Sequence, residues 1–438
     1  MRESKIRILL LAALCFCSGF LTAQTESDTS DYYHQNYFRY ENYIYNNNIK
    51  TVVLERSDAP LTDPVIEKNT TDRLILTFDD LGSDLKNYSY TFIHCNSDWT
   101  PSNIITSQYL PGFFDDRILD YDYSFNTKQT YTHYSLVFPN QNLNPVLSGN
   151  YILKVFETDY PDSVIITRRW MIFEDKVQID ARVKRATIIA DRYTKQEIDF
   201  SIFHPLLEIQ NPFNDIKVVL TQNGRWDNAI TNLKPLYLKD KLLDYNYDEE
   251  NVFNGGNEFR TFDIRPLKFQ TQYIKGIIED STGYHVYVAD ELSRAFLVYA
   301  IWDDINGKFL NVIYEDRESD TEADYATVHF KLKMPDPVYK GTPYIFGGLT
   351  DWRILKEAKL KYNYDNLSYE TSLYLKQGYY NYEYVVLNDG TSDIDETLIE
   401  GNHFETENDY AIFVYHRPIG GRYDQLVGWK KLNSKKIY

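Results

Sequence analysis

Three runs of sequence decide the expected fold: YSYTFIHCNSDWTPSN at residues 88–103, DYDYSFNTKQTYTHYSLVFPN at 120–140 and LSGNYILKVFETDYPDSVIITRRWMIFED at 147–175. Aromatic and β-branched residues dominate each run, which is typical of strands. In the first run Tyr88, Tyr90 and Phe92 recur at every second position, the spacing of a strand with one buried face. Asn, Ser, Asp, Pro and Gly residues separate the runs and predict turns. The sequence therefore predicts an antiparallel β-domain.

Short strand patterns continue to the end of the chain, with no sustained apolar period of 3.6 residues. We therefore expect an all-β fold of three consecutive β-sandwich, immunoglobulin-like domains. Expected strands of the second domain include residues 216–222, 259–264 and 284–290, and residues 108–119 of the first domain are expected to form a long loop. The expected divisions are a signal peptide at 1–23, a polar lead-in at 24–44, and domains at 45–175, 176–300 and 301–438.

The first 23 residues have the organisation of a secretory signal. Arg2, Lys5 and Arg7 precede an apolar run at residues 8–20, and small residues follow before Gln24. The alternatives are an uncleaved membrane anchor, for which the apolar run is short, and a lipid attached to Cys15 or Cys17, neither of which follows a small residue. We expect cleavage after Ala23 and a mature protein without a lipid anchor.

Composition narrows the classes of partner. The chain has 39 Tyr, 24 Phe and 6 Trp residues and a formal charge of −18. Residues 1–23 contain three basic side chains and one acidic one, so their removal leaves a charge of −20. This charge opposes binding to nucleic acids or to anionic lipid surfaces. Tyrosine suits half-buried strands, because its ring packs while its hydroxyl stays hydrated.

No catalytic, cofactor-binding or metal-binding motif stands out. The chain has no G-x-S-x-G, H-E-x-x-H, C-x-x-C or phosphate-binding glycine motif. His94 and His133 could be metal ligands, but each stands alone within a strand pattern, where a histidine packed in the structure is the commoner outcome. The acidic run at 120–126 has the alternating oxygens of a calcium loop, but Phe125 and Tyr131 stand at the sixth and twelfth positions, where such loops have Gly and an acid. After signal removal the single thiol, Cys95, cannot form an internal disulfide and is expected to be buried.

The first third of the chain resembles the type IX secretion system plug protein family of Bacteroidetes. The resemblance rests on residues in the family's order, and we expect them to be structural: Phe78, Asp79, Asp80, Leu81, His94, Cys95, Asn96, Asp98, Trp99, Asn126, Thr127, Tyr131, His133, Tyr134, Ser148, Gly149, Asn150, Tyr151, Arg168 and Arg169. We call these the signature residues. The resemblance implies a non-enzymatic periplasmic protein, associated with the inner face of the outer membrane. Its implied partner is the translocon barrel of that system, whose periplasmic end it closes. We expect a monomer.

The last third looks like the early-set immunoglobulin-like domains that include glycogen-binding modules. The likeness rests on TPYIFGGLTDW at residues 342–352, on GYYNYEY at 378–384 and on the turn at Asn388–Asp389–Gly390, which suits a tight hairpin. In such modules the position of Trp352 belongs to a sugar platform or to the core. Trp99 and Trp352 are thus candidates for sugar stacking or for packing at a core or interface. The alternative function is a periplasmic or surface glycan-binding protein. A hydrolase would need a carboxylate pair or nucleophile that the sequence does not reveal.

Overall fold

The computed structural model describes residues 38–82, 84–314 and 318–437. Strands dominate these residues and nearly all pair antiparallel, which confirms the expected all-β fold. The expected signal at 1–23 lies outside the described residues, as does most of the expected lead-in at 24–44. The end of that lead-in is part of the fold, because β1 (Tyr43–Ile44) pairs with a strand of the first domain.

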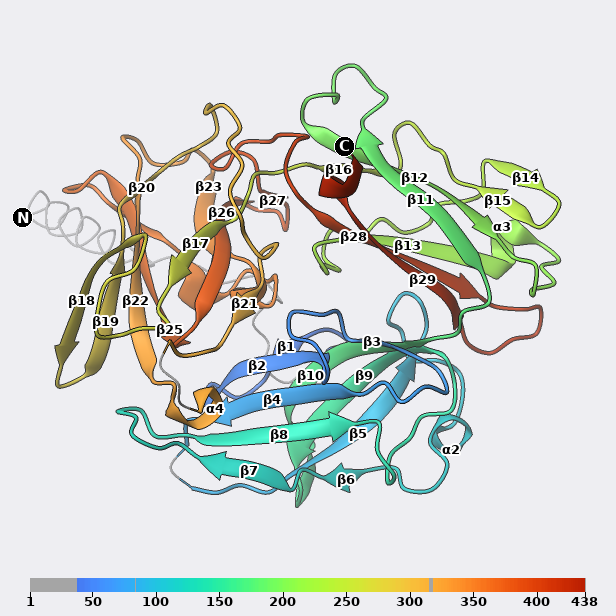
Figure 1. Cartoon of the computed structure of the whole chain (residues 1–438), viewed down its shortest axis with the longest axis horizontal. Helices are drawn as coiled ribbons and strands as arrows, with labels where there is room; N and C mark the ends of the chain where they lie inside the picture. The colour runs from blue at the N-terminus through green and yellow to red at the C-terminus, as the bar shows by residue number, and fades with distance from the viewer. Residues whose placement is uncertain (1–37, 83, 315–317, 438) are drawn as a thin grey trace, which may run out of the picture. The chain divides into compact units, whose positions relative to one another are not determined.

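The first core lies between two sheets (Figure 1). One contains β1, β10 (Tyr160–Phe173), β9 (Gly149–Glu157), β5 (Tyr88–Cys95) and β6 (Asp116–Arg117) in that order, with β3 (Val65–Glu67) parallel to β10; the other contains β2 (Ile49–Arg56), β4 (Leu74–Asp80), β8 (Thr132–Phe138) and β7 (Asp120–Tyr123). Tyr88, Tyr90 and Phe92 are all buried in this core, as their alternation predicts. The ring of Phe92 packs 4.9 Å from that of Trp170, which holds the sheets together through large aromatic contacts.

The second core combines strands from distant parts of the chain. Its sheets are β11 (Gln178–Arg185), β12 (Lys195–Phe203), β15 (Leu242–Asp244) and β14 (Tyr237–Lys239), with β16 (Val252–Asn254) beside β12, and β13 (Ile216–Gln222), β28 (Asp409–His416) and β29 (Gln425–Asn433). Figure 1 shows the red strands β28 and β29 beside the green β13. The expected strand at 216–222 matches β13, but its partner comes from the C-terminal end of the chain.

The strands of the third core come from the part of the sequence that lies between the two parts of the second core. One sheet contains β17 (Arg260–Asp263), β26 (Tyr379–Asn388) and β21 (Phe309–Leu310), with β23 (Gly341–Phe346) and β27 (Ile394–Asp395) also paired to β26. The other contains β18 (Ile274–Asp280), β19 (Gly283–Val288), β22 (Tyr325–Lys333), β25 (Ser368–Lys376) and β24 (Lys361–Asn363), with β20 (Glu291–Leu292) beside β22. The Asn388–Asp389–Gly390 turn follows β26, and Gly390 has a φ of +77°.

The cores therefore interleave along the chain, and the expected boundary at residue 300 does not separate them. Strands β17, β18 and β19 precede residue 300 but belong to the third core, whereas β28 and β29 belong to the second. Strand β28 explains why the C-terminal part of the chain returns to the second core. It is buried along nearly its whole length and lies between β13 and β29. A strand buried in this way needs a neighbour on each side to satisfy its backbone. Residues 39–438 form one compact unit.

Among the residues that the structure describes, helical structure is limited to single turns. These are α2 (Thr106–Tyr109), α3 (Pro212–Asp215), α4 (Ser319–Glu322), η2 (Gly348–Thr350), η3 (Lys356–Ala358) and η4 (Ser434–Ile437). The expected loop at 108–119 contains the end of α2 and all of β6. Within the described ranges, no helix has the length and apolar character needed to cross a membrane.

Candidate functional site

Many signature residues lie where the first core meets the other two, rather than around a cavity. Two buried carboxylates organise these contacts. We call the contacts of Asp79 with the third core the Asp79 joint, and the contacts of Asp424 with the first core the Asp424 joint.

The Asp79 joint is a buried charge cluster. Asp79 on β4 is fully buried and accepts three hydrogen bonds of 2.7 Å, from His133 Nδ1, Tyr325 Oη and Lys376 Nζ. His133 lies directly opposite Asp79 on β8. Directly opposed residues of paired strands point to the same face of the sheet, so the two side chains meet. Lys376, at the end of β25, is itself only 2% exposed. A buried ammonium without a carboxylate partner is strongly unfavourable, so this pair ties the first core to the third.

The loop between β7 and β8 extends the same joint. The backbone N–H groups of Lys128 and Gln129 donate to the carboxylate of Asp324, at 2.6 and 3.1 Å. The signature residue Tyr131 donates from its hydroxyl to the carbonyl of Ala323 at 2.8 Å. Asn126 has a φ of +57°, a conformation that Asn tolerates better than most residues, and the Thr127 hydroxyl closes the turn onto the carbonyl of Gln129. These residues shape the loop that docks beside α4.

The Asp424 joint connects the first core to the second. Asp424 is fully buried and accepts from the backbone N–H and hydroxyl of Ser97, at 3.0 and 2.8 Å. Lys217 Nζ and Arg417 Nε donate to the same carboxylate, at 3.0 and 2.8 Å. Burial by itself raises the pKa of Asp424, but the hydrogen bonds from Ser97 and Lys217 outweigh burial, so the pKa lies below its ordinary value. The carboxylate stays charged and holds the two cores together.

His94 is buried beside the Asp424 joint and has a hydrogen-bond partner at each ring nitrogen. Its Nε2 lies 3.2 Å from the carbonyl of Ser148 and its Nδ1 2.9 Å from the hydroxyl of Ser102. The carbonyl can only accept, so Nε2 carries the proton and Nδ1 accepts from Ser102. Burial lowers the pKa of His94 to about 4, so the ring is neutral at physiological pH. Gly149 leaves room for this ring, because a Cβ at that position would lie 2.6 Å from His94 Nε2.

The neighbouring signature residues make structural contacts as well. Asn150 donates to the carbonyl of Asn96 at 3.0 Å and accepts from the Tyr415 hydroxyl at 2.8 Å, which adds a second link between the first two cores. Tyr151 is fully buried in the first core. Asp98 accepts hydrogen bonds from the backbone N–H and from the hydroxyl of Thr100, which holds the turn at residues 98–100.

Trp99 and Cys95 are packed and not available for ligands. Trp99 is 5% exposed, its ring meets that of Trp226 edge-on at 4.9 Å, and the Arg169 guanidinium lies 4.5 Å from the Trp99 ring. Burial lowers the pKa of Arg169 to about 10. Cys95 is a buried free thiol, and burial raises its pKa to about 12. A protonated thiol of this kind is a poor nucleophile.

Of the remaining signature side chains, some pack in the first core and one forms another contact between the first and third cores. Asp80 accepts from the Tyr88 hydroxyl at 2.7 Å and pairs with Lys86 at 3.0 Å, and Tyr134 stacks in the first core. Arg168 is 3% exposed and its Nη2 lies 3.1 Å from Asp351 Oδ2, next to Trp352. The first core is thus joined to the third at a second point.

Trp352 is partly buried and packs against the third core. The guanidinium of Arg225, from the loop after β13, lies 4.9 Å from its ring, and Phe259 and Phe346 meet it edge-on at 5.8 and 5.5 Å. Gly307 lies against the same indole, where a Cβ would approach to 2.2 Å. These contacts favour an interface role for Trp352 over sugar stacking.

The acidic run at 120–126 does not form a calcium loop. Asp120 and Asp122 lie on β7, and all four residues of that strand are exposed. Across the ranges that the structure describes, no three His, Cys, Asp or Glu side chains converge as a metal site would require.

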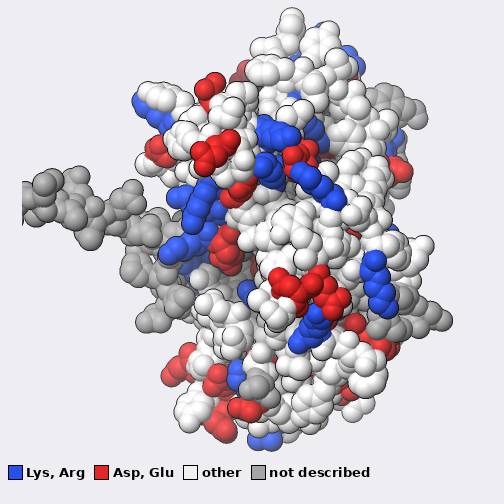
Figure 2. Space-filling model, turned by 90° about the vertical axis from the view of Figure 1, so that its left-hand side faces the viewer, with Lys and Arg blue, Asp and Glu red and all other residues white. Residues whose placement is uncertain are grey.

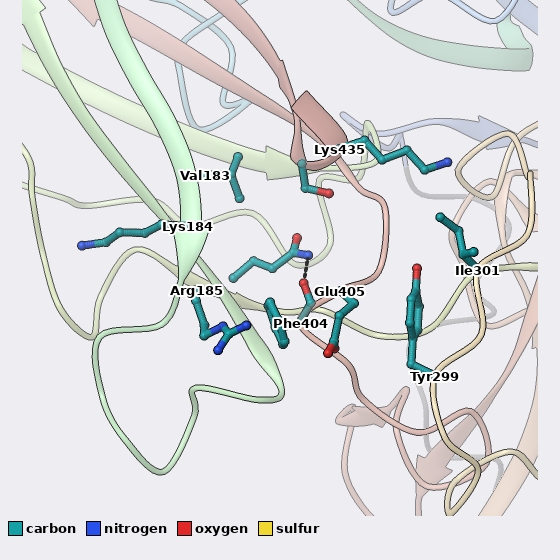
Figure 3. A pocket seen from close by; sticks show the side chains of 10 residues that line it. Val183, Lys184, Arg185, Tyr299, Ile301, Phe404, Glu405 and Lys435 are labelled. Carbon is teal, nitrogen blue, oxygen red and sulfur yellow. Dashed lines mark hydrogen bonds between the residues drawn. The ribbon is translucent and has the colours of Figure 1, made fainter. Parts of the chain in front are cut away.

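One cavity of about 470 Å³ lies between the second core and the segment 299–301 (Figure 3). Val183, Lys184 and Arg185 line it from β11, and Tyr299 and Ile301 line it from the opposite side (Figure 3). Phe404 also lines the cavity. Gln196 Nε2 donates to the Phe404 carbonyl at 2.6 Å, the bond drawn in Figure 3. None of its lining residues is a signature residue, so no sequence motif pointed to it. The face in Figure 2 shows acidic and basic side chains interspersed, with wide uncharged areas between them.

Sequence reasoning missed the partners in the joints. Tyr325, Lys376 and Arg417 carry no motif, and each lies far along the chain from the signature residue it meets, which is Asp79 for the first two and Asn96 for Arg417. Asp424 carries no motif either and meets Ser97, which lies far from it in the sequence and is not a signature residue. A charged residue within an otherwise strand-like run, such as Lys376, is the one local signal, and it does not name a partner.

The comparisons with known proteins agree with this arrangement. The model of the type 9 secretion system plug protein first domain matches residues 49–174. A crystal structure of a hypothetical protein from Parabacteroides merdae ATCC 43184, at 2.30 Å resolution, is 32% identical over 91% of this chain and 100% of that chain, with a TM-score of 0.87. A biofilm associated protein BSP domain, 7% identical over 89% of this chain and 59% of that one, has a TM-score of 0.17 and carries no argument. None of the curated proteins compared matches this chain. The chain belongs to the type 9 secretion system plug protein family.

Proposed function

We propose that this protein is a periplasmic plug. It docks on the outer-membrane translocon barrel of the type IX secretion system and closes the periplasmic end of that barrel when no cargo is passing. In this proposal the protein acts by occlusion, as a monomer at the inner face of the outer membrane, and uses no catalytic group. The observation that carries the proposal is the family match over residues 49–174.

The joints support this function physically. The lumen of a large barrel widens with the number of strands, so a plug must be a wide body that keeps its shape under thermal motion. Independent domains on flexible linkers would let solutes pass between them. The buried Asp79–Lys376 pair and the hydrogen bonds from Ser97 to the buried Asp424 carboxylate instead bind the cores to one another. Occlusion needs a body that keeps its shape and does not need a reactive group.

The test is a deletion strain of the native host. Removing the gene should raise outer-membrane entry of large antibiotics and leave secretion of cargo largely intact, because a plug limits leakage rather than transport. Restoring the gene should restore the barrier, and a strain that lacks both barrel and plug should not leak. An unchanged permeability barrier in cells that retain the barrel but lack the plug would refute the function.

A further inference from the structure

The segment at residues 296–301 exposes an unusual amount of apolar surface. Phe296 is 100% exposed and Val298 92%, and Leu297 and Ile301 are also largely exposed. Single exposed apolar residues are common on soluble proteins, but a contiguous group of them marks an interaction site. This group is AFLVYAI at 295–301, and it stands next to the cavity of Figure 3, where Tyr299 and Ile301 are labelled.

The backbone of this segment is open to a partner. Leu297 N–H donates to the carbonyl of Arg294 and closes a turn. Beyond it, the N–H and C=O groups of residues 298–303 form no hydrogen bond to any residue that the structure describes. The segment is held through side chains instead: Tyr299 donates to Glu258, and Trp302 Nε1 donates to the carbonyl of Phe259. Free backbone groups in a strand-prone sequence are what an added β-strand pairs with.

The cavity beside the segment can receive an apolar side chain. Val183, Phe404 and Ile301 supply apolar wall on different sides of a space of about 470 Å³. Pockets of this size with mainly apolar walls and a few polar groups are typical binding sites. A strand laid along residues 298–303 would place its side chains beside the opening.

Arg185 supplies the polar feature that selects the occupant. Its guanidinium lies 3.8 Å from the centroid of the Phe404 ring, and no carboxylate of the described residues lies within ion-pairing distance of it. The other cations of the cavity are already paired, Lys184 with Glu197 and Asp199 and Lys435 with Glu407. Glu405 also lines the cavity, without an ion pair to Arg185. An arginine held on an aromatic ring with its donors free is complementary to a carboxylate.

We infer that residues 296–301, the cavity and Arg185 together bind an extended segment of a partner protein. The segment pairs as a β-strand with residues 298–303, inserts an apolar side chain into the cavity and places a carboxylate on Arg185. This inference rests on the proposed function, and the partner it commits to is a segment of the translocon complex. The surface formed by residues 296–301, the cavity and Arg185 is then the surface by which the plug holds its partner.

The test uses full-length tagged protein expressed in the native host and recovered from detergent-solubilised outer membranes. Val298→Asp should reduce the recovered barrel at least tenfold, because a charge replaces the apolar surface beside the strand. Arg185→Glu should reduce it several-fold through repulsion of the carboxylate. Ile419→Asp is the matched control, since Ile419 is a similarly exposed apolar residue on another loop, and it should recover the barrel as the wild type does. Circular dichroism of each purified variant checks that it folds.

Each outcome is informative. Protection of residues 298–303 from hydrogen exchange in the complex, together with the loss for Val298→Asp, supports the inference. Capture of the barrel by Val298→Asp and Arg185→Glu at the wild-type level refutes the inference and leaves the proposed function standing. Failure of the wild type to capture the barrel refutes the proposed function and the inference with it. A wild-type dimer that Val298→Asp dissociates assigns the surface to a second copy of the chain and overturns the inference.

Discussion

The Asp79 joint makes a quantitative prediction about stability. Asp79→Asn keeps the size of the side chain and removes its charge, which leaves the buried Lys376 ammonium without its carboxylate. Breaking a buried pair by removing one partner costs about 3–5 kcal/mol. Lys376 retains the carbonyl of Asp320 at 2.8 Å and the ring of Tyr131 at 4.3 Å, so we expect the lower end, a loss of about 3 kcal/mol in the free energy of unfolding.

A double variant separates the ion pair from general damage. Lys376→Met alone should destabilise the protein by a similar amount, because it leaves a buried carboxylate without its cation. The combination of Asp79→Asn with Lys376→Met should recover at least half of the summed loss, since a buried pair replaced by neutral groups is often close to neutral in stability. Asp122→Asn, on the neighbouring exposed strand β7, is the control and should change stability by less than about 0.5 kcal/mol.

The assay is urea unfolding followed by tryptophan fluorescence and by circular dichroism. The midpoint and the slope together give the free energy of unfolding for each variant. The reasoning fails if Asp79→Asn costs less than about 1 kcal/mol, or if the double variant is as unstable as the sum of the single ones.

Three further predictions concern other parts of the protein. Gly149→Ala should lower the melting temperature markedly, because the new Cβ would meet His94 at 2.6 Å, whereas Gly112→Ala, also at positive φ but with no atom within 4 Å, should have a smaller effect; calorimetry of the two variants compares them. Burial raises the pKa of Glu258 to about 7, so the folded state binds this proton more tightly than the unfolded state, and the stabilisation present below pH 4.5 is lost as pH rises through 7. Glu258→Gln should therefore gain stability relative to the wild type between pH 5 and 8, and a constant difference in melting temperature across that range would contradict this. The third core should show no micromolar binding of maltoheptaose in titration calorimetry, because Arg225, Phe259, Phe346 and Gly307 pack against the ring of Trp352. Saturable binding that Trp352→Ala removes without unfolding would show a glycan site instead.

Much of the local structure was predictable from the sequence. The strand expected at 216–222 has the bounds of β13, and the alternation of Tyr88, Tyr90 and Phe92 correctly assigned the buried face of β5. Strand character depends on residue type and a period of two, which neighbouring residues decide among themselves. The signature residues likewise identified the family, because they stand in order within one continuous stretch.

The pairing of strands and the roles of the signature residues depended on the tertiary structure. Asp79 meets Lys376 across 297 positions and Ser97 meets Asp424 across 327, and no local pattern encodes such partners. The entropy of closing a loop grows only slowly with its length, so β28 and β29 could return to the second core at little extra cost, and the cores interleave. The exposure of Phe296 and Val298 was equally beyond the sequence, since an apolar run predicts burial. The sequence by itself determined the strand character of segments such as β5 and β13 and the buried face of β5, because those properties are local. The tertiary structure alone decided which strands meet, which charges pair and which apolar segment is left uncovered, because those depend on contacts between distant parts of the chain.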